Sequence, residues 1–234
     1  MLDGLPIVRE AFPRTVRLVT TARLRNAVLR PLVDSEAEIA ELAELEGATS
    51  ARMVGQNRGF VGIDPKEFVY GIPHAAFINA SFAYAKPREL SRFSGPNRGA
   101  WYAALHIDTC LREVIFHMAE FLEAAGDFNA VVDYAEMFAS FAGEFVDLRD
   151  VTSKPTYLNP NKAIGYPAGN ALADAIRHEG LNGIIYPSVR HRGGTCVVAL
   201  WPHAVQSVAQ GGIYRVTWRG APDPQVQQMP PVPE

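Results

Sequence analysis

A short stretch of the sequence, residues 91–117, contains three residue types that could act together on one substrate. Arg92 lies in a loop rich in Gly and Pro, Tyr102 follows on a predicted strand, and Glu113 lies within the apolar helix expected next. A carboxylate can oppose positive charge on a sugar, an aromatic ring offers a face to a cation, and a guanidinium fork fits a pyrophosphate. If the loop, strand and helix pack as one unit, the three side chains can converge on one cleft.

A second polar segment, residues 186–194, lies far downstream between two predicted strands. Its Ser188 can donate or accept a hydrogen bond, and Arg190, His191 and Arg192 could form a phosphate site. A hydrated loop is the alternative for the three basic residues.

Each candidate also has a purely structural alternative. Tyr102 could be an aromatic residue of the core, and Arg92 a solvated surface charge. Ser188 follows a proline and could only shape a turn, whereas Glu113 could form a salt bridge on the polar side of its helix. His117, one helical turn after Glu113, could orient that carboxylate or simply pack.

A metal site is a further alternative, because Glu113 and His117 share one helix face and His106 lies nearby in the sequence. Two such side chains at helical spacing are common by chance, so we expect no metal. Cys110 and Cys196 have no spacing typical of a zinc site or a disulfide framework. The common signatures of nucleotide-binding loops, zinc proteases and serine hydrolases are not found in the sequence.

The composition is that of an ordinary globular protein, with 234 residues of which 48% are apolar and 20% charged. A net charge of -3 and a pI near 6.1 provide no basic field for a phosphate backbone, so we expect no nucleic-acid binding. The sequence has no run of roughly 18 apolar residues that could span a membrane, and its N-terminal segment does not read as a signal peptide. Two cysteines fit a reducing compartment, so we expect a cytoplasmic protein.

The hydrophobic periodicity predicts an α+β domain. A capping box at Ser35 and Glu38 predicts a helix that ends at Gly47, and residues 51–98 are expected to be loops around one or two short elements. Further helices are expected at residues 110–122, capped by Asp108 and Thr109, and at residues 168–178. Strands are expected at residues 100–105, 130–134, 144–148, 183–186, 195–201, 205–208 and 213–218. Because strands outnumber helices and do not alternate with them, we expect a mixed or antiparallel β core with flanking helices.

These segments resemble the RES domain, a family named for its Arg, Glu and Ser. The resemblance rests on the pattern R-F-x-G-x₃-G-x-W-Y, on a following T-x₃-E-x₃-H helix, and on G-I-x-Y-P-S-V-R with a later G-G. Matching by position gives Arg92, Tyr102, Glu113 and Ser188 as functional residues. Arg98 is the alternative for the arginine, and the ten-residue distance to Tyr102 favours Arg92. Weaker similarity extends upstream through residues 17–19, residues 42–47 and Arg52.

The resemblance implies a single domain with a fold like that of the ADP-ribosyltransferase toxins. This domain would span residues 1–221, with core blocks at 88–125 and 165–205, an N-terminal extension at 1–87 packed on them, and a flexible tail at 222–234.

The resemblance also implies the toxin of a bacterial toxin-antitoxin pair, which cleaves the nicotinamide-ribose bond of its substrate NAD+. Water, phosphate or a protein could accept the ADP-ribose; a mono-ADP-ribosyltransferase and a non-catalytic NAD+-binding module are the alternatives. The partner would be an Xre-type helix-turn-helix antitoxin. Whether the protein also forms a homo-oligomer stays open. The expected NAD+ contacts are Arg92, Tyr102, Ser188, Arg98, His117 and Arg190.

Overall fold

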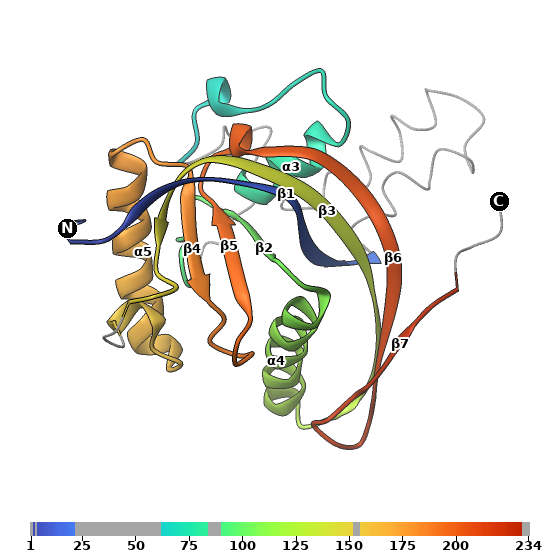
Figure 1. The fold of residues 1–234 in the computed structure, drawn as a ribbon. Coiled ribbons are helices and arrows are strands. Elements are labelled where there is room, and N and C mark those ends of the chain that lie inside the picture. Colours follow the sequence, from blue (N-terminus) through green and yellow to red (C-terminus); the bar gives the residue numbers. More distant parts are fainter. Residues whose placement is uncertain (1, 3, 22–61, 84–89, 152–154, 231–234) are drawn as a thin grey trace.

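The computed structural model describes the chain except for residues 1, 3, 22–61, 84–89, 152–154 and 231–234. The helix expected after Ser35 and the upstream similarity at residues 42–47 and Arg52 lie outside the described residues. The described residues form a mixed α+β fold built on one strongly curved sheet (Figure 1). The expected fold class is therefore confirmed.

The sheet has seven strands in the order β1-β2-β5-β4-β3-β6-β7. Within the described part of the chain every strand pair is antiparallel except β3 with β4. The strands are β1 (Ile7–Thr20), β2 (Trp101–Ala104), β3 (Asn129–Asp147), β4 (Gly183–Pro187), β5 (Thr195–Ala199), β6 (Val205–Arg219) and β7 (Gln225–Gln228).

Strand β3 organises the sheet, because it pairs with β1 along one side and with β6 and then β4 along the other. Strand β1 also touches β2 at the pair Val16 and Ala104. The pairings β1-β2-β5-β4-β3 therefore close on themselves, while β6 and β7 continue outward from β3. This closure bends the sheet into the arch of Figure 1.

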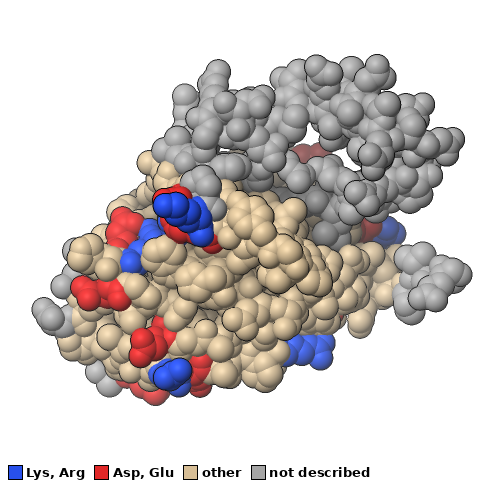
Figure 2. Space-filling view, turned by 90° about the horizontal axis from the view of Figure 1, so that it is seen from above, with Lys and Arg blue, Asp and Glu red and all other residues tan. Residues whose placement is uncertain are grey.

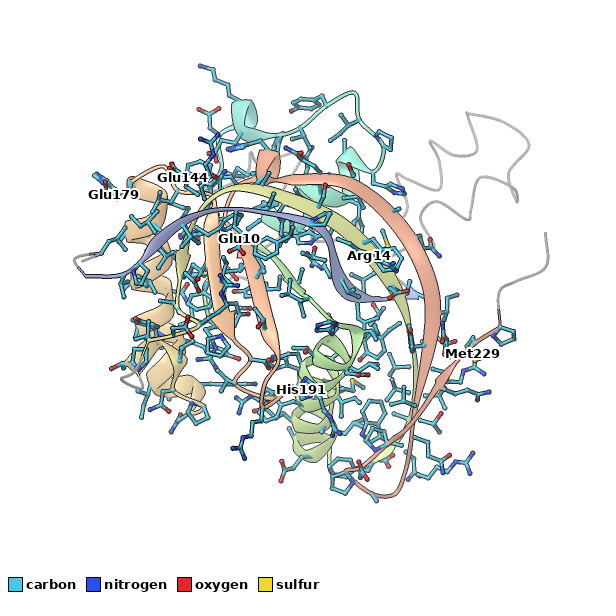
Figure 3. The ribbon with its side chains drawn as sticks, viewed as in Figure 1. Glu10, Arg14, Glu144, Glu179, His191 and Met229 are labelled. Carbon is cyan, nitrogen blue, oxygen red and sulfur yellow. The ribbon has the colours of Figure 1, made fainter. Side chains whose placement is uncertain are left out.

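The helices cover opposite faces of the sheet. Helices α4 (Ile107–Ala125) and α5 (Lys162–His178) pack on one face through side chains such as Leu122 and Ile176. Helix α3 (Ala75–Ala83) packs on the other face through Ile78 and Phe82. Side chains from both faces fill the space between the sheet and its helices (Figure 3), and short 3₁₀ helices lie at Pro65–Glu67, Thr156–Leu158 and Pro202–Ala204.

Several expected elements are longer in the structure. In two places, two neighbouring segments expected as separate strands form one continuous strand. Residues 130–134 and 144–148 both belong to the β3 region, because Gly143 does not make a turn there. A Cβ at Gly143 would lie 2.1 Å from Oδ1 of Asn182, so glycine allows this side chain to approach the strand. Residues 205–208 and 213–218 are both in β6, which absorbs register shifts against β3.

The N-terminal residues 7–20 are a strand of the sheet, so an extension merely packed on the domain is wrong for this segment. The pairing of β1 with β3 shifts register between Phe12 and Thr15, on either side of Pro13 and Arg14. Proline cannot donate to a ladder and is found at such irregularities. The charged residues Arg9, Glu10, Arg14 and Arg17 interrupt the apolar residues of β1, which hid the strand from a search for apolar runs.

The flexible tail expected at residues 222–234 is wrong over Gln225–Gln228. These residues form β7, which pairs with β6 from Tyr214 to Thr217. Their side chains are exposed, so backbone hydrogen bonds rather than apolar burial hold the strand. That is why composition alone suggested a flexible segment.

Charged side chains on the face in Figure 2 are few and of both signs, so the described residues show no continuous basic patch there. Among the described residues, no helix combines the length and the apolar character needed to cross a bilayer.

Substituting Gly169 of α5 tests the close packing of this helix on the loop before β2. A Cβ at this position would lie 2.0 Å from the carbonyl oxygen of Arg92, a contact that forces the backbone apart. Gly169→Ala should lower the free energy of unfolding by about 1–3 kcal/mol, although alanine favours a helix by about 1 kcal/mol. Urea denaturation measures the change.

The matched control is Ala171→Gly on the exposed side of the same helix, which should cost about 1 kcal/mol through helix propensity alone. A Gly169→Ala protein as stable as the wild type would contradict the close approach.

Candidate functional site

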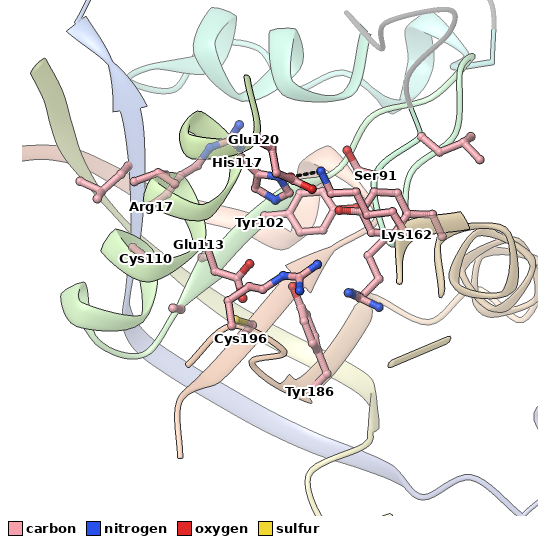
Figure 4. Close-up of a pocket in the computed structure, with 18 of the residues that line it drawn as sticks. Arg17, Ser91, Tyr102, Cys110, Glu113, His117, Glu120, Lys162, Tyr186 and Cys196 are labelled. Carbon is pink, nitrogen blue, oxygen red and sulfur yellow. Dashed lines mark hydrogen bonds and ion pairs between the residues drawn. The ribbon is translucent and has the colours of Figure 1, made fainter. Parts of the chain in front are cut away.

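A cleft of about 900 Å³ opens between α4, α5 and the sheet face that they cover (Figure 4). This volume is typical of small-molecule sites. The lining residues come from β1, the segment before β2, β2 itself, α4, α5, β4, β5 and the loop after β4. They are Arg17, Leu18, Leu90, Ser91, Arg92, Tyr102, Ala103, Ala104, Cys110, Glu113, Val114, His117, Glu120, Phe121, Lys162, Ala163, Tyr166, Pro167, Tyr186, Arg190 and Cys196.

Glu113 lies on the face of α4 that borders the cleft, with Tyr102 and Tyr186 facing the same space (Figure 4). The Ser188 hydroxyl donates a hydrogen bond of 2.6 Å to Oε1 of Glu113. The same hydroxyl oxygen accepts the backbone N–H groups of Arg190 (3.2 Å) and His191 (3.0 Å). The carboxylate is therefore fixed in position by a serine that the backbone itself holds.

This geometry refines the role expected for Ser188. Its single O–H is directed at Glu113, and Ser188 is not among the lining residues. The structure thus brings Ser188 and Glu113 together, with the serine behind the carboxylate rather than on the cleft wall.

Tyr102 lines the cleft from β2, and its hydroxyl is held by the loop that precedes the strand. It accepts the backbone N–H of Phe93 at 2.8 Å and lies 3.1 Å from Oγ of Ser94. Burial of this phenol raises its pKa to about 12, so it remains neutral at physiological pH. The ring is fixed at one end and presents its body to the cleft.

Arg92 also borders the cleft but is only 8% exposed, so the surface-charge alternative is wrong. Its Nη1 donates to the carbonyl oxygens of Tyr157 (2.9 Å) and Asn159 (3.0 Å), and its guanidinium lies 5.4 Å from the ring centre of Tyr166. Among the described residues no hydrogen bond uses its Nε or Nη2. Arg92 therefore has a structural role and retains donors that could face a ligand.

Two glycines of α5 make room for this arginine. A Cβ at Gly165 would lie 2.8 Å from Nη1 of Arg92, and one at Gly169, a helical turn later, 2.0 Å from its carbonyl oxygen. Asn170 of the same helix donates to the carbonyl oxygen of Ser91 at 2.7 Å. The sequence did not indicate this contact, because glycine at helical spacing is ordinarily read as a helix breaker.

Arg98, also expected to contact the ligand, is not among the residues that line the cleft. Its guanidinium forms an ion pair with Glu67, donates to the carbonyl oxygen of Gly62 at 3.1 Å, and lies 4.7 Å from the ring centre of Trp201. Arg98 anchors the segment around Glu67 to the domain. Of the two candidate arginines, only Arg92 borders the cleft.

A group of charged and aromatic side chains forms the other end of the cleft. Arg190 donates to the carbonyl oxygen of Pro160 at 2.8 Å, and its guanidinium lies 3.6 Å from the ring centre of Phe116. Lys162 pairs with Glu120 and lies 5.4 Å from the same ring. These contacts join α4, α5 and the loop after β4.

His117 lies beside this group, with Nδ1 3.5 Å from Oε2 of Glu120. Partial burial and then the positive charge of Lys162 lower its pKa, so the imidazole is neutral at pH 7. His117 lines the cleft, and among the described residues no hydrogen bond joins it to Glu113.

Lys162, Tyr166, Glu120 and Tyr186 line the cleft but were not among the expected site residues. The first two were missed because the expected helix began at residue 168, after Pro167. The observed helix begins at Lys162, and its N-cap Asn161 accepts the N–H of Ala163 through its side chain. Asn161 is a typical helix start and was the signal available in the sequence.

The two cysteines lie at the floor of the cleft as free thiols. Burial raises the pKa of Cys110 to about 12 and raises that of Cys196 as well, so neither is a ready nucleophile. His106 is the exposed N-cap of α4, and within the described residues no three His, Cys, Asp or Glu side chains are grouped to hold a metal ion.

The fold and this cleft define an α+β domain with a positioned carboxylate in a cleft of small-molecule size. The family model of the RES domain matches residues 68–219, more than half of the chain, and the chain therefore belongs to the RES domain family. No curated protein matches the sequence. Among solved structures, one similar chain is in the crystal structure of the M. tuberculosis MbcT-MbcA toxin-antitoxin complex. It shares 15% sequence identity, the match covers 54% of this chain and 74% of that chain, and the TM-score is 0.37.

Replacing Lys162 tests the electrostatics at His117. Lys162→Ala should raise the pKa of His117, because it removes a nearby positive charge and leaves Glu120 without its ion-pair partner. An NMR titration of the His117 ring measures the midpoint, which we expect below 6.5 in the wild type.

Lys66→Ala, in the 3₁₀ helix Pro65–Glu67, is the matched control and should leave the His117 midpoint in place. An equal midpoint in wild type and Lys162→Ala would show that the lysine charge does not reach the imidazole.

Proposed function

We propose that this protein cleaves the nicotinamide-ribose bond of NAD+, as its RES resemblance implies. The single observation that carries the proposal is the Glu113 carboxylate, held by Ser188 at the wall of a cleft of about 900 Å³. Loss of nicotinamide leaves positive charge on the ribose, in an oxocarbenium-like transition state of the kind that carboxylates stabilise in glycosidases. A fixed carboxylate opposes this charge more strongly in the transition state than in the ground state.

The geometry of the cleft fits the two ends of such a substrate. Tyr102 and Tyr186 offer rings near the carboxylate, where a cationic nicotinamide could stack. Arg190 and the remaining donors of Arg92 could bind the negative pyrophosphate. The neutral phenol of Tyr102 suits stacking and makes it a poor base.

Water or inorganic phosphate would accept the ADP-ribose in this proposal. Transfer to a protein side chain is the second candidate, since Phe121 at the cleft wall is 66% exposed and could contact a protein acceptor. Incubation with labelled NAD+ and a bacterial lysate separates the two, because transfer leaves label on protein and hydrolysis or phosphorolysis leaves it in small molecules. Stoichiometric NAD+ binding without nicotinamide release would identify a non-catalytic binding module.

We further propose that the protein is a cytoplasmic toxin controlled by an Xre-type helix-turn-helix antitoxin. This proposal rests on the family resemblance together with the cleavage reaction, since depletion of NAD+ stops growth. The antitoxin would act by blocking the cleft.

Glu113→Gln should lower the rate of nicotinamide release from NAD+ by about 100-fold or more, because it removes the charge that opposes the oxocarbenium ion while keeping the shape of the side chain. Chromatographic quantification of nicotinamide measures the rate. Glu123→Gln, the same change on the exposed side of α4, is the control and should match the wild type. Equal rates for Glu113→Gln and wild type would remove Glu113 from the mechanism.

Inducing the wild-type chain in bacteria should arrest growth and lower cellular NAD+ by about tenfold or more, which follows if turnover exceeds resynthesis. Glu113→Gln should be harmless at equal protein level. Growth arrest by both proteins, with NAD+ unchanged, would disprove the proposed link between cleavage and toxicity.

A further inference from the structure

The loop between β4 and β5 contacts α4 at two points. The first contact is the hydrogen bond from Ser188 to Glu113. The second joins Oγ1 of Thr109 and Nδ1 of His191, which lie 2.9 Å apart. Thr109 and Glu113 are four residues apart on one face of α4, so two successive helical turns contact the same loop.

The contact between Thr109 and His191 is partly buried and closely packed. Thr109 is 0% exposed, and its Oγ1 contacts Nδ1 of His191, which lies on the loop beside α4 (Figure 3). A Cβ at Gly194 would lie 2.6 Å from Oγ1 of Thr109 and 2.9 Å from Nδ1 of His191. The pair therefore occupies space that only a glycine leaves open.

The loop transmits this contact to Ser188 through its backbone. The N–H of His191 donates to Oγ of Ser188 at 3.0 Å, and the N–H of Ser188 donates to the carbonyl oxygen of Gly194 at 2.8 Å. The N–H of Gly194 donates to the carbonyl oxygen of His191 at 3.0 Å, which closes the turn. Moving the His191 ring would shift the N–H that orients the Ser188 hydroxyl.

We propose that Thr109 and His191 are positioning residues, which hold Ser188 so that its O–H points at the Glu113 carboxylate. The proposal rests on the proposed cleavage of NAD+, because it assigns the pair a role in that reaction. Neither residue is among those lining the cleft, so both act through Ser188 rather than on the substrate. A positioned carboxylate matters most in the transition state, and therefore the pair should affect kcat more than KM.

The experiment compares variants that remove or keep the polar groups of the contact between Thr109 and His191. Thr109→Val removes the contact while keeping the volume, and should lower kcat by about fivefold to tenfold with KM nearly unchanged. Thr109→Ser keeps the hydroxyl and should restore most of the rate. His191→Asn, whose amide can reach the place of Nδ1, should likewise retain more activity than His191→Ala. Thr217→Val on β6 is the matched control and should behave as wild type.

A double-variant cycle separates positioning from general destabilisation. In a Ser188→Ala background, Thr109→Val should have little further effect on kcat, because the hydroxyl through which it acts is gone. A fivefold loss that persists in the Ser188→Ala background would overturn the proposal, and so would an unchanged kcat in well-folded Thr109→Val.

A second readout does not depend on NAD+ cleavage. Hydrogen exchange at the amide of Arg190, which donates to Ser188, should accelerate in Thr109→Val and return to the wild-type rate in Thr109→Ser. If the wild-type protein releases no nicotinamide, the proposed function fails, and the exchange rates still decide whether the pair holds Ser188. Equal exchange in the wild type and Thr109→Val would overturn the positioning role.

Discussion

The hydrogen bond from Ser188 to Glu113 joins two parts of the chain that are 75 residues apart in the sequence. Its 2.6 Å length is that of a charge-assisted O–H···O⁻ bond, which is stronger than a neutral one. Without this bond, a glutamate on a half-exposed helix face would sample several rotamers. Fixing one of them costs side-chain conformational entropy. The serine selects one, and the backbone amides on its oxygen prevent it from turning away. The position of the cleft carboxylate thus depends on a contact between side chains that lie far apart in the sequence.

The sheet topology brings these two segments together. Strand β5 lies between β2 and β4, so the end of β2, where α4 begins, lies close to the loop that joins β4 and β5. Register fixes the faces as well: Tyr102 and Tyr186 both point to the side covered by α4 and α5, whereas Trp101 and Ile185 point to the other side. A shift of one residue in either strand would turn its tyrosine away from the cleft. The antiparallel pairing therefore determines which side chains face the cleft.

Local sequence signals predicted the parts of the site that a single element carries. The apolar spacing of α4 placed Glu113 and His117 on one face, and the Tyr186-Pro187 sequence ended β4 before Ser188. The sequence could not show contacts between residues that only the topology brings together. These are the hydrogen bond from Ser188 to Glu113, the bonds from Arg92 to carbonyl oxygens, and the ion pair of Arg98 with Glu67. Long strands were also missed, because β1 and β3 are bent, carry polar residues and gain their stability from pairing on both sides.

The two arginines of the loop before β2 show why contact, rather than residue type, decides a role. Both are nearly buried, both lie over an aromatic ring, and both donate to backbone carbonyl oxygens. Arg98 forms an ion pair with Glu67, so its positive charge is compensated within the protein. Among the residues that the structure describes, Arg92 donates to neutral carbonyl oxygens and forms no ion pair, so these contacts orient the guanidinium without cancelling its charge. Arg92 borders the cleft and Arg98 does not, so the contacts of each arginine, rather than its residue type, separate the two.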